Sequence, residues 1–172
     1  MLFKKEKEKI EPITNKVNPF LVVEDLKSLK ICFSFNNDFK IIEDDLEEYR
    51  FYADLNFRRK YDAEVLSLIA ANVPPGKMLD IGTYMGNSAA RMAANSPEST
   101  VYTVNIHPDE LNEGGKLVTG VPKLEEIGSF YRKKGLKNVK QILANTKTWD
   151  IPDEIEELSL VYVDGSHDTE FV

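Results

Sequence analysis

Cysteine, histidine and long apolar runs are scarce in this chain of 172 residues. Cys32 is the sole cysteine, which excludes an internal disulfide and a zinc site built from clustered cysteines. A reduced, cytoplasmic location is therefore expected. No segment approaches the ~18 apolar residues of a membrane span. The opening MLFKKEKEKIEP carries charge without the apolar stretch of a signal peptide.

Basic charge is also in deficit, with 22 Lys and Arg against 29 Asp and Glu and a net charge of −7. Nucleic acid is not expected as a partner, because binding to phosphates needs a basic face. The charges are largely interspersed along the chain, so the acidity is expected to serve solubility.

From residue 60 onward, short apolar segments alternate with helical patterns. Strands are expected at 77–81, 100–106, 138–144 and 158–163, with helices at 62–72, 87–95 and about 123–134. The first helix ends at the breaker Pro74-Pro75-Gly76, and the last carries Leu124, Ile127 and Tyr131 on one stripe. This alternation predicts an α/β fold with a parallel sheet and right-handed crossovers.

The first 59 residues show no such alternation. Residues 1–18 are expected to form a solvated, flexible terminus and 19–59 an appendage, leaving 60–172 as the main domain. Within the appendage, KICFSF-NND-FKII predicts a hairpin around the Asn-Asn-Asp turn. A helix is expected to open at Asp44 and Asp45, with an apolar face of Leu46, Tyr49, Tyr52 and Ala53.

The stretch LDIGTYMGNSAA, residues 79–90, places Asp80 and Gly82 at a strand end and Gly86 at a helix start. A dinucleotide-binding turn would need glycine where Tyr84 and Asn87 stand, so a nicotinamide or flavin dinucleotide is disfavoured. The Gly-Lys-Ser/Thr ending of a phosphate loop is absent too, which disfavours nucleotide triphosphatases. A glycine turn that serves folding alone remains the alternative.

This stretch resembles the first motif of class I S-adenosylmethionine-dependent methyltransferases, especially small-molecule O-methyltransferases of the catechol and caffeoyl type. The resemblance implies a Rossmann-like doubly wound sheet with strand order 3-2-1-4. It also implies that S-adenosyl-L-methionine binds at the turn, through Asp80, Gly82, Thr83, Tyr84, Gly86 and Ser88. For Ser88 and Asn87, plain helix capping is the alternative.

The same resemblance assigns three further cofactor contacts. Asn105 stands where the family has an acidic residue that binds the ribose hydroxyls, and its amide lacks the charge that strengthens such bonds. Ile106 matches an apolar residue that packs on adenine, and Asn145 a polar residue near the adenine amino group.

The stretch VDGSHD, residues 163–168, resembles the end of the fourth strand in metal-assisted O-methyltransferases, including those acting on sugars and macrolides. That resemblance implies that Asp164 binds Mg²⁺ and that His167 is the general base. An acceptor hydroxyl must lose its proton, imidazole titrates near neutrality, and a divalent cation lowers the pKa of a hydroxyl. A turn in which His167 only caps a helix is the alternative.

The resemblance covers residues 60–172, whereas family members continue with three more strands and an acidic pair. A truncated methyltransferase, or one completed by another polypeptide, is therefore expected, and the fourth-strand edge is expected to pair with another chain. The expected function is methyl transfer from S-adenosylmethionine to a hydroxyl of a small molecule, with sugars among the candidates. Two alternatives stay open: a non-catalytic half-domain that binds the cofactor or a partner, and a metal-dependent hydrolase using Asp164, His167 and Asp168.

Overall fold

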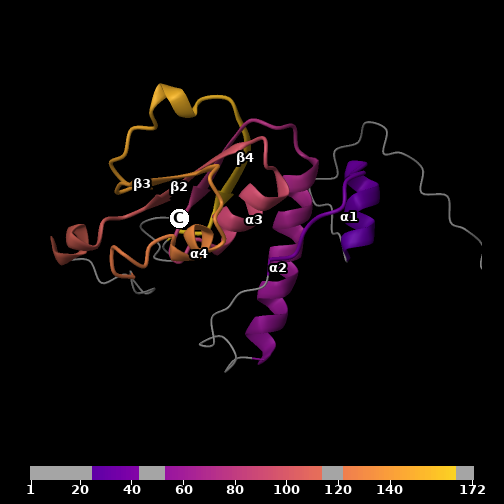
Figure 1. Ribbon diagram of the computed structural model, residues 1–172, viewed down its shortest axis with the longest axis horizontal. Helices are drawn as coiled ribbons and strands as arrows, with labels where there is room; N and C mark the ends of the chain where they lie inside the picture. The colour runs from indigo at the N-terminus through magenta and orange to yellow at the C-terminus, as the bar shows by residue number, and fades with distance from the viewer. Residues whose placement is uncertain (1–24, 43–52, 114–121, 166–172) are drawn as a thin grey trace, which may run out of the picture.

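A four-stranded parallel sheet forms the centre of the molecule (Figure 1). The structure, a computed structural model, describes residues 25–42, 53–113 and 122–165. The strands are β1 (Lys77–Ile81), β2 (Thr100–Asn105), β3 (Val139–Leu143) and β4 (Leu158–Val163). They lie in the order β3-β2-β1-β4, and all neighbours are parallel. The predicted α/β class and strand order are confirmed.

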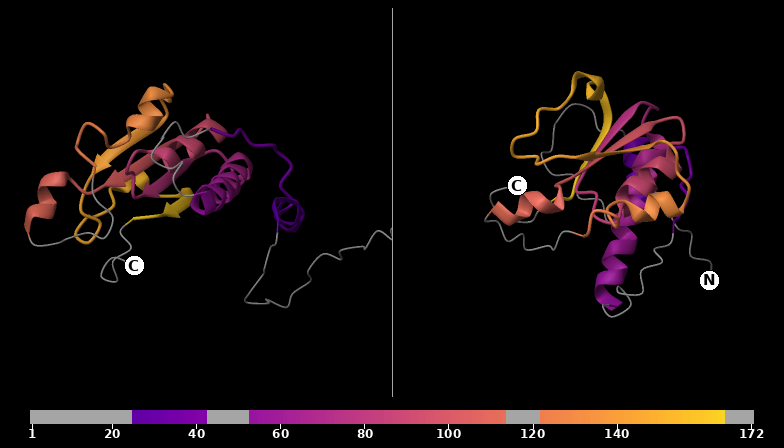
Figure 2. Two further views of the ribbon diagram at one scale, coloured as in Figure 1. Left: turned by 90° about the horizontal axis from the view of Figure 1, so that it is seen from below. Right: turned by 60° about the vertical axis from the view of Figure 1, so that its left-hand side comes forward.

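Helices cover one face of this sheet and irregular chain covers the other (Figures 1 and 2). α2 (Ala53–Asn72), α3 (Asn87–Asn95) and α4 (Ser129–Lys133) supply the first layer, where Met78 and Val101 pack under apolar side chains of all three helices. On the second face, Leu79, Tyr102 and Val104 pack with Ile155 of the short 3-10 helix η3 (Asp153–Ile155). A second 3-10 helix, η2 (Pro108–Glu113), follows β2.

Element bounds agree best with the predictions where a glycine or proline marks the end. β1, α3 and β4 have the predicted bounds, and α2 ends as expected just before Pro74-Pro75-Gly76 but begins earlier. α4 is much shorter than predicted, because Gly128 with φ +69° interrupts the helical path before it. Ile127 and Tyr131 are buried as expected, whereas Leu124 is 47% exposed.

The hairpin predicted around the Asn-Asn-Asp turn is wrong. Its first arm belongs to a helix, α1 (Leu26–Phe33), because the Asp25 side chain accepts a hydrogen bond from Ser28 N–H at 2.6 Å and caps the first turn. Ser34 ends the helix in the left-handed region. Residues 35–42 then run without strand pairing across the ends of two helices.

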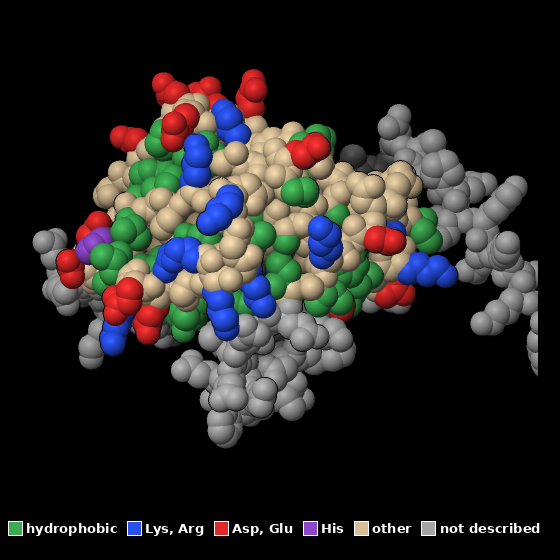
Figure 3. Space-filling view, viewed as in Figure 1, with side chains coloured by type: hydrophobic (Ala, Val, Ile, Leu, Met, Phe, Trp, Pro, Cys, Tyr) green, Lys and Arg blue, Asp and Glu red, His purple; other side chains and the backbone are tan. Residues whose placement is uncertain are grey.

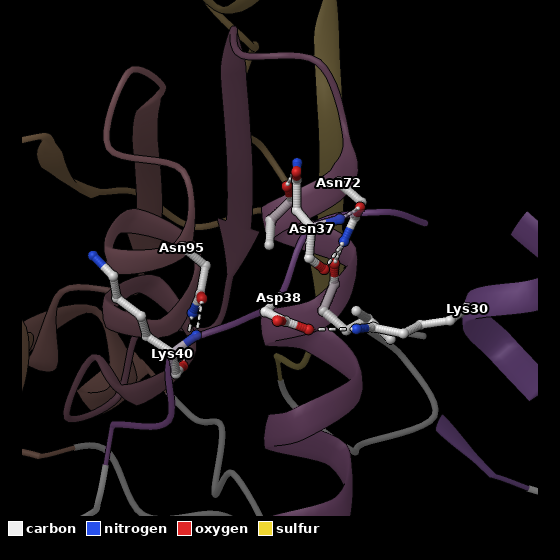
Figure 4. Close-up of polar contacts among 8 residues, drawn as sticks. Lys30, Asn37, Asp38, Lys40, Asn72 and Asn95 are labelled. Atoms are coloured by element: carbon white, nitrogen blue, oxygen red, sulfur yellow. Dashed lines mark hydrogen bonds and ion pairs between the residues drawn. The ribbon is translucent and has the colours of Figure 1, made fainter. Parts of the chain in front are cut away.

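Two asparagine side chains provide the backbone partners that a second strand would have provided (Figure 4). At the end of α2, Asn72 accepts from Asn37 N–H at 2.8 Å and donates to Asn37 C=O at 3.1 Å. At the end of α3, Asn95 accepts from Lys40 N–H at 2.6 Å and donates to Lys40 C=O at 3.1 Å. These side-chain amides satisfy the extended backbone of this segment in the way a sheet ladder would.

Of the helix predicted from Asp44, Asp45 to Ala53, only Ala53 falls within the part of the chain that the structure describes, and there it begins α2. Within that part, no helix combines the length and apolar character needed to cross a membrane.

Candidate functional site

The glycine turn lies where the strand order reverses direction, between β1 and β4. From β1 the chain proceeds to β2 and β3 on one side, and β4 lies on the other side. In open parallel sheets, ligands bind at the carboxyl ends of the strands beside such a switch point. The β4 end is directly beside the turn, because Asp164 N–H donates to Ile81 C=O at 2.8 Å.

The backbone of the turn is held from two sides. Gly82 N–H and Thr83 N–H both donate to Val104 C=O of β2, at 2.9 and 3.1 Å. From the α4 side, Gly128 N–H donates to Tyr84 C=O and Phe130 N–H to Met85 C=O, both at 2.9 Å. Such a turn is preorganised, so a ligand that binds it orders little additional backbone.

Close packing inside the protein explains why glycine occupies the turn. At Gly82, with φ +107°, a Cβ atom would lie 2.1 Å from the Asp164 carbonyl oxygen. At Gly86, with φ +90°, it would lie 2.6 Å from the Tyr131 ring and 2.9 Å from Gly128 Cα. These glycines let β4 and α4 approach the turn. A larger residue at Gly82 would therefore disturb the fold itself.

Tyr84 adopts a backbone conformation that is uncommon for a residue with a side chain. Its φ is +46°, in the left-handed region, and the residue is 43% exposed. The Asn105 side-chain oxygen accepts from Tyr84 N–H at 3.0 Å, and Gly128 bonds to its carbonyl oxygen. The conformation is therefore stabilised by both neighbouring elements, and it leaves this aromatic residue partly exposed beside the strand ends.

Asp80 is completely buried on the helix-covered face of β1. Thr103 O–H donates to its Oδ2 at 2.6 Å, while Oδ1 has no hydrogen-bond partner. Burial raises the pKa of Asp80 from 3.8 to about 7, with the Thr103 hydrogen bond opposing the shift and the nearby Asp164 charge adding to it. The predicted cofactor contact at Asp80 is therefore not open to solvent in this structure.

A chain of hydrogen bonds connects Asp80 to β2, the turn, β3 and α4. Because Thr103 donates to Asp80, Thr83 must donate to Thr103 across their 2.8 Å contact. Gln141 Nε2 donates to Thr83 Oγ1 at 2.9 Å, and Tyr131 O–H donates to Gln141 Oε1 at 3.2 Å. The donors thus run in one direction, from α4 through β3, the turn and β2, to the buried carboxyl of β1.

The sheet register accounts for this chain. Thr103 pairs with Asp80 on one side and with Gln141 on the other, and Asp80 pairs with Tyr162 of β4. Since paired residues of neighbouring strands point to the same face, one polar row crosses all four strands. Burial, together with the Asp164, Asp62 and Asp80 charges, raises the pKa of Tyr162.

Asn105 and Ile106 lie next to the turn, at the end of β2. The Asn105 side chain is 9% exposed; its oxygen accepts from Tyr84 N–H, and its amide nitrogen donates to Ile106 C=O at 2.9 Å. The side-chain oxygen keeps a second lone pair that can accept from a ligand hydroxyl. Ile106 is half-buried and offers apolar surface beside it.

The remaining predicted contacts have other local roles. Asn145 accepts from Lys147 N–H at 3.1 Å and forms a turn after β3. Gly86 is the N-cap residue of helix α3, which therefore has no side-chain cap, so the capping alternative for Ser88 and Asn87 is not observed. Ser88 is half-buried in the first turn of that helix, and the Asn87 side-chain oxygen is buried without a hydrogen-bond partner.

Of the predicted acceptor site, only Asp164 falls within the described part of the chain; His167 and Asp168 lie outside it. Asp164 is exposed directly after β4. Across residues 25–42, 53–113 and 122–165, no three or more His, Cys, Asp or Glu side chains are grouped closely enough to hold a metal ion. The described donors therefore do not make a magnesium site by themselves.

Comparison with known proteins assigns no family to this chain. No family model matches the sequence. The curated proteins contain no match either. The class that fold and site define is thus an α/β protein with a Rossmann-like parallel layer and a glycine turn at its switch point.

Three residues around the turn were missed by sequence reasoning: Thr103, Gln141 and Gly128. A fourth, Tyr131, is predicted from the sequence only as part of an apolar stripe. Thr103 and Gln141 are polar residues within strands, and this can be seen in the sequence. Knowledge of the strand register would have placed both of them in one row with Asp80. Gly128 lies within a stretch that has a helical apolar stripe, and its positive φ could not be inferred from that periodicity.

Proposed function

We propose that this chain binds S-adenosyl-L-methionine at the glycine turn and transfers its methyl group to a hydroxyl of a small molecule. The observation that carries the proposal is the meeting of the turn, Asn105 and Asp164 at the switch point of the sheet. The turn has the motif that resembles the methyltransferases. The resemblance gives Asn105 a ribose-binding role and Asp164 a metal-binding role beside the acceptor.

The residues around the turn fit this cofactor. The Asn105 side-chain oxygen can accept a hydrogen bond from a ribose hydroxyl through its second lone pair while it still accepts one from Tyr84 N–H. Ile106 supplies apolar contact for a planar base. The first N–H groups of α3, near Ser88, suit a carboxylate because a helix N-terminus favours negative charge.

Asp80 and Thr83 would act on the cofactor indirectly in this proposal. Both side chains are buried, and they hold the turn to β2 and β3 through Thr103 and Gln141. Their contribution is orientation, because a turn held in one conformation presents the sulfonium methyl group in one place.

When bound, S-adenosylmethionine supplies the electrophilic methyl group. Asp164 lies exposed beside the turn, where a carboxylate can orient an acceptor hydroxyl. His167, three residues further on, would take the hydroxyl proton, since imidazole titrates near neutrality. No step is assigned to a metal ion.

A second function, cofactor binding without turnover, needs only the groups around the turn, whose backbone is held by β2 and α4 with Asn105 beside it. A half-domain of this kind would hold the cofactor and leave the chemistry to another polypeptide.

Calorimetric titration separates these proposals. We expect saturable binding of S-adenosylmethionine and of its demethylated product, with NAD as the comparison ligand. Methylation of a hydroxyl acceptor that His167→Ala lowers by ~10²–10⁴, without loss of cofactor affinity, would favour the enzyme. Cofactor binding without turnover would favour the half-domain, and binding of NAD alone would contradict both.

A further inference from the structure

The two outer strands of the sheet are each paired on one side only within the described part of the chain. β3 pairs with β2, and β4 pairs with β1. β4 reads LSLVYV, the near-continuous apolar sequence typical of an interior parallel strand. Nevertheless, Val161 and Val163 are 47% and 67% exposed. An apolar strand with a free side and little cover is a pairing site for another strand.

The two edges differ in charge: the region of β3 is basic and the region of β4 is acidic. Residues 127–149 contain six Lys and Arg and no Asp or Glu, whereas 150–164 contain six Asp and Glu and no Lys or Arg. The boundary falls between β3 and β4. In Figure 3, acidic side chains gather at the upper rim, where η3 lies, and Lys and Arg side chains lie below it over the region of β3 and α4.

The opposite charges lie at equivalent places along the two edges. Lys137 and Lys140 are exposed at the start of β3. Glu156 and Glu157 are exposed immediately before β4. The signs continue beyond the strands, with Lys147 after β3 and Asp164 after β4.

We propose that β4 of one copy pairs in parallel with β3 of a second copy, so that the sheet continues across two molecules. This alignment brings Glu156 and Glu157 beside the second copy's Lys137 and Lys140. The parallel direction also keeps the helical layers of both copies on the same face of the extended sheet. Pairing of β4 with β4 would oppose acids, and pairing of β3 with β3 would oppose lysines, so charge disfavours both.

The contact is head-to-tail, and it is independent of the proposed function. Each added copy leaves one β3 edge and one β4 edge available, so association grows with concentration until a ring closes. Lysines on an edge strand hinder pairing with neutral or basic edges. Here the same lysines favour pairing with an acidic edge.

Light scattering with size-exclusion chromatography tests the proposal on the 172-residue chain, whose mass is 19.6 kDa. At ~0.05 M salt the average mass should rise above that of one copy as concentration increases. At ~0.5 M salt it should return toward one copy, because screening weakens contacts between exposed charges.

Charge exchange identifies the surfaces. The double variants Lys137→Glu/Lys140→Glu and Glu156→Lys/Glu157→Lys should each associate at least about tenfold more weakly, and their equimolar mixture should associate like wild type. Lys140 lies over the Tyr102 ring, so Lys137→Glu alone replaces the first variant if circular dichroism shows unfolding.

Matched controls reverse exposed charges outside the two edge strands and the residues that flank them: Lys27→Glu/Lys123→Glu and Glu110→Lys/Glu125→Lys. They should associate like wild type. A wild-type mass of one copy at every concentration and salt would overturn the proposal. So would controls that lose association as strongly as the edge variants, or a mixture that fails to restore it.

Discussion

At the scale of single residues, Asp80 has the most unusual environment in the site. Its carboxyl is fully buried and keeps one oxygen without a hydrogen-bond donor. Its pKa is raised from 3.8 to about 7, so the folded state holds a proton that the unfolded state releases between these values. Stability from this group is therefore complete below about pH 4 and is lost as the pH rises to about 7.

We expect Asp80→Asn to remove this pH dependence. Asparagine keeps an acceptor for Thr103 and carries no charge to bury, so the free energy of unfolding should lose a slope of ~1.4 kcal/mol per pH unit between about pH 4 and 7. Denaturant unfolding of wild type and variant at pH 5, 6 and 7 measures the difference. Equal slopes in the two proteins would show that Asp80 is already ionised at pH 5.

Asn105 is expected to serve the turn and the cofactor through one oxygen atom. Asn105→Asp preserves an acceptor for Tyr84 N–H, so cofactor affinity should be kept or increased, because carboxylates accept stronger hydrogen bonds from hydroxyls. Asn105→Leu removes the acceptor and should weaken binding by ~1–3 kcal/mol. Calorimetric titration of the demethylated product measures both effects.

Thermal unfolding of the same two variants provides the control. If Asn105→Leu bound the cofactor like wild type, the ribose would have to lie elsewhere. If it bound weakly only because it was partly unfolded, the loss would disappear at lower temperature.

At the scale of elements, the turn depends on how closely α4 packs against it. Gly128 and Gly135 flank this helix with nearly equal φ values of +69° and +70°. A Cβ at Gly128 would lie 2.3 Å from the Tyr131 ring, whereas a Cβ at Gly135 would meet nothing within 4 Å. The pair separates backbone strain from packing against the Tyr131 ring, which itself lies next to Gly86 of the turn.

Gly135→Ala should cost ~1–2 kcal/mol of stability, the strain of a left-handed alanine. Gly128→Ala should cost a further ~1–3 kcal/mol, because the Tyr131 ring would have to move and would strain its hydrogen bond to Gln141 Oε1. Denaturant unfolding measures the costs. Cofactor affinity should fall in Gly128→Ala alone. An equal fall in both variants would show that the packing of α4 against the turn does not affect cofactor binding.

The elements differ in how well the sequence predicts them, for identifiable reasons. β1, α3 and β4 have local signals at both ends, such as Gly86 at the start of α3 and the apolar run of β4. The sequence predicts the Asn-Asn-Asp turn and second arm of a hairpin at residues 36–42, whereas the extended backbone there pairs with the side chains of Asn72 and Asn95, which are distant in sequence. Side-chain partners of this kind leave no periodic pattern.

At the scale of the whole molecule, the alternation of strands and helices was sufficient to predict the parallel sheet and, with the family resemblance, its order. The positions of Gly82, Tyr84, Asn105 and Asp164 around one point follow from that order. The buried chain from Tyr131 to Asp80 does not, because it depends on strand register and on the packing of α4. The segregation of charge between the β3 and β4 edges was visible in the sequence, but it has structural meaning only once those strands are the outer ones.

The central claim is that the cofactor binds at the glycine turn, and mapping of amide chemical shifts tests it most directly. During titration of ¹⁵N-labelled protein with the demethylated product of S-adenosylmethionine, the amides of residues 82–88 and of Ile106 should shift together and saturate. The amides of Asn37 and Lys40, held by Asn72 and Asn95 at the other ends of α2 and α3, should stay unchanged. Saturating shifts that cluster away from residues 82–88, or no shifts at all in a folded protein, would contradict the account.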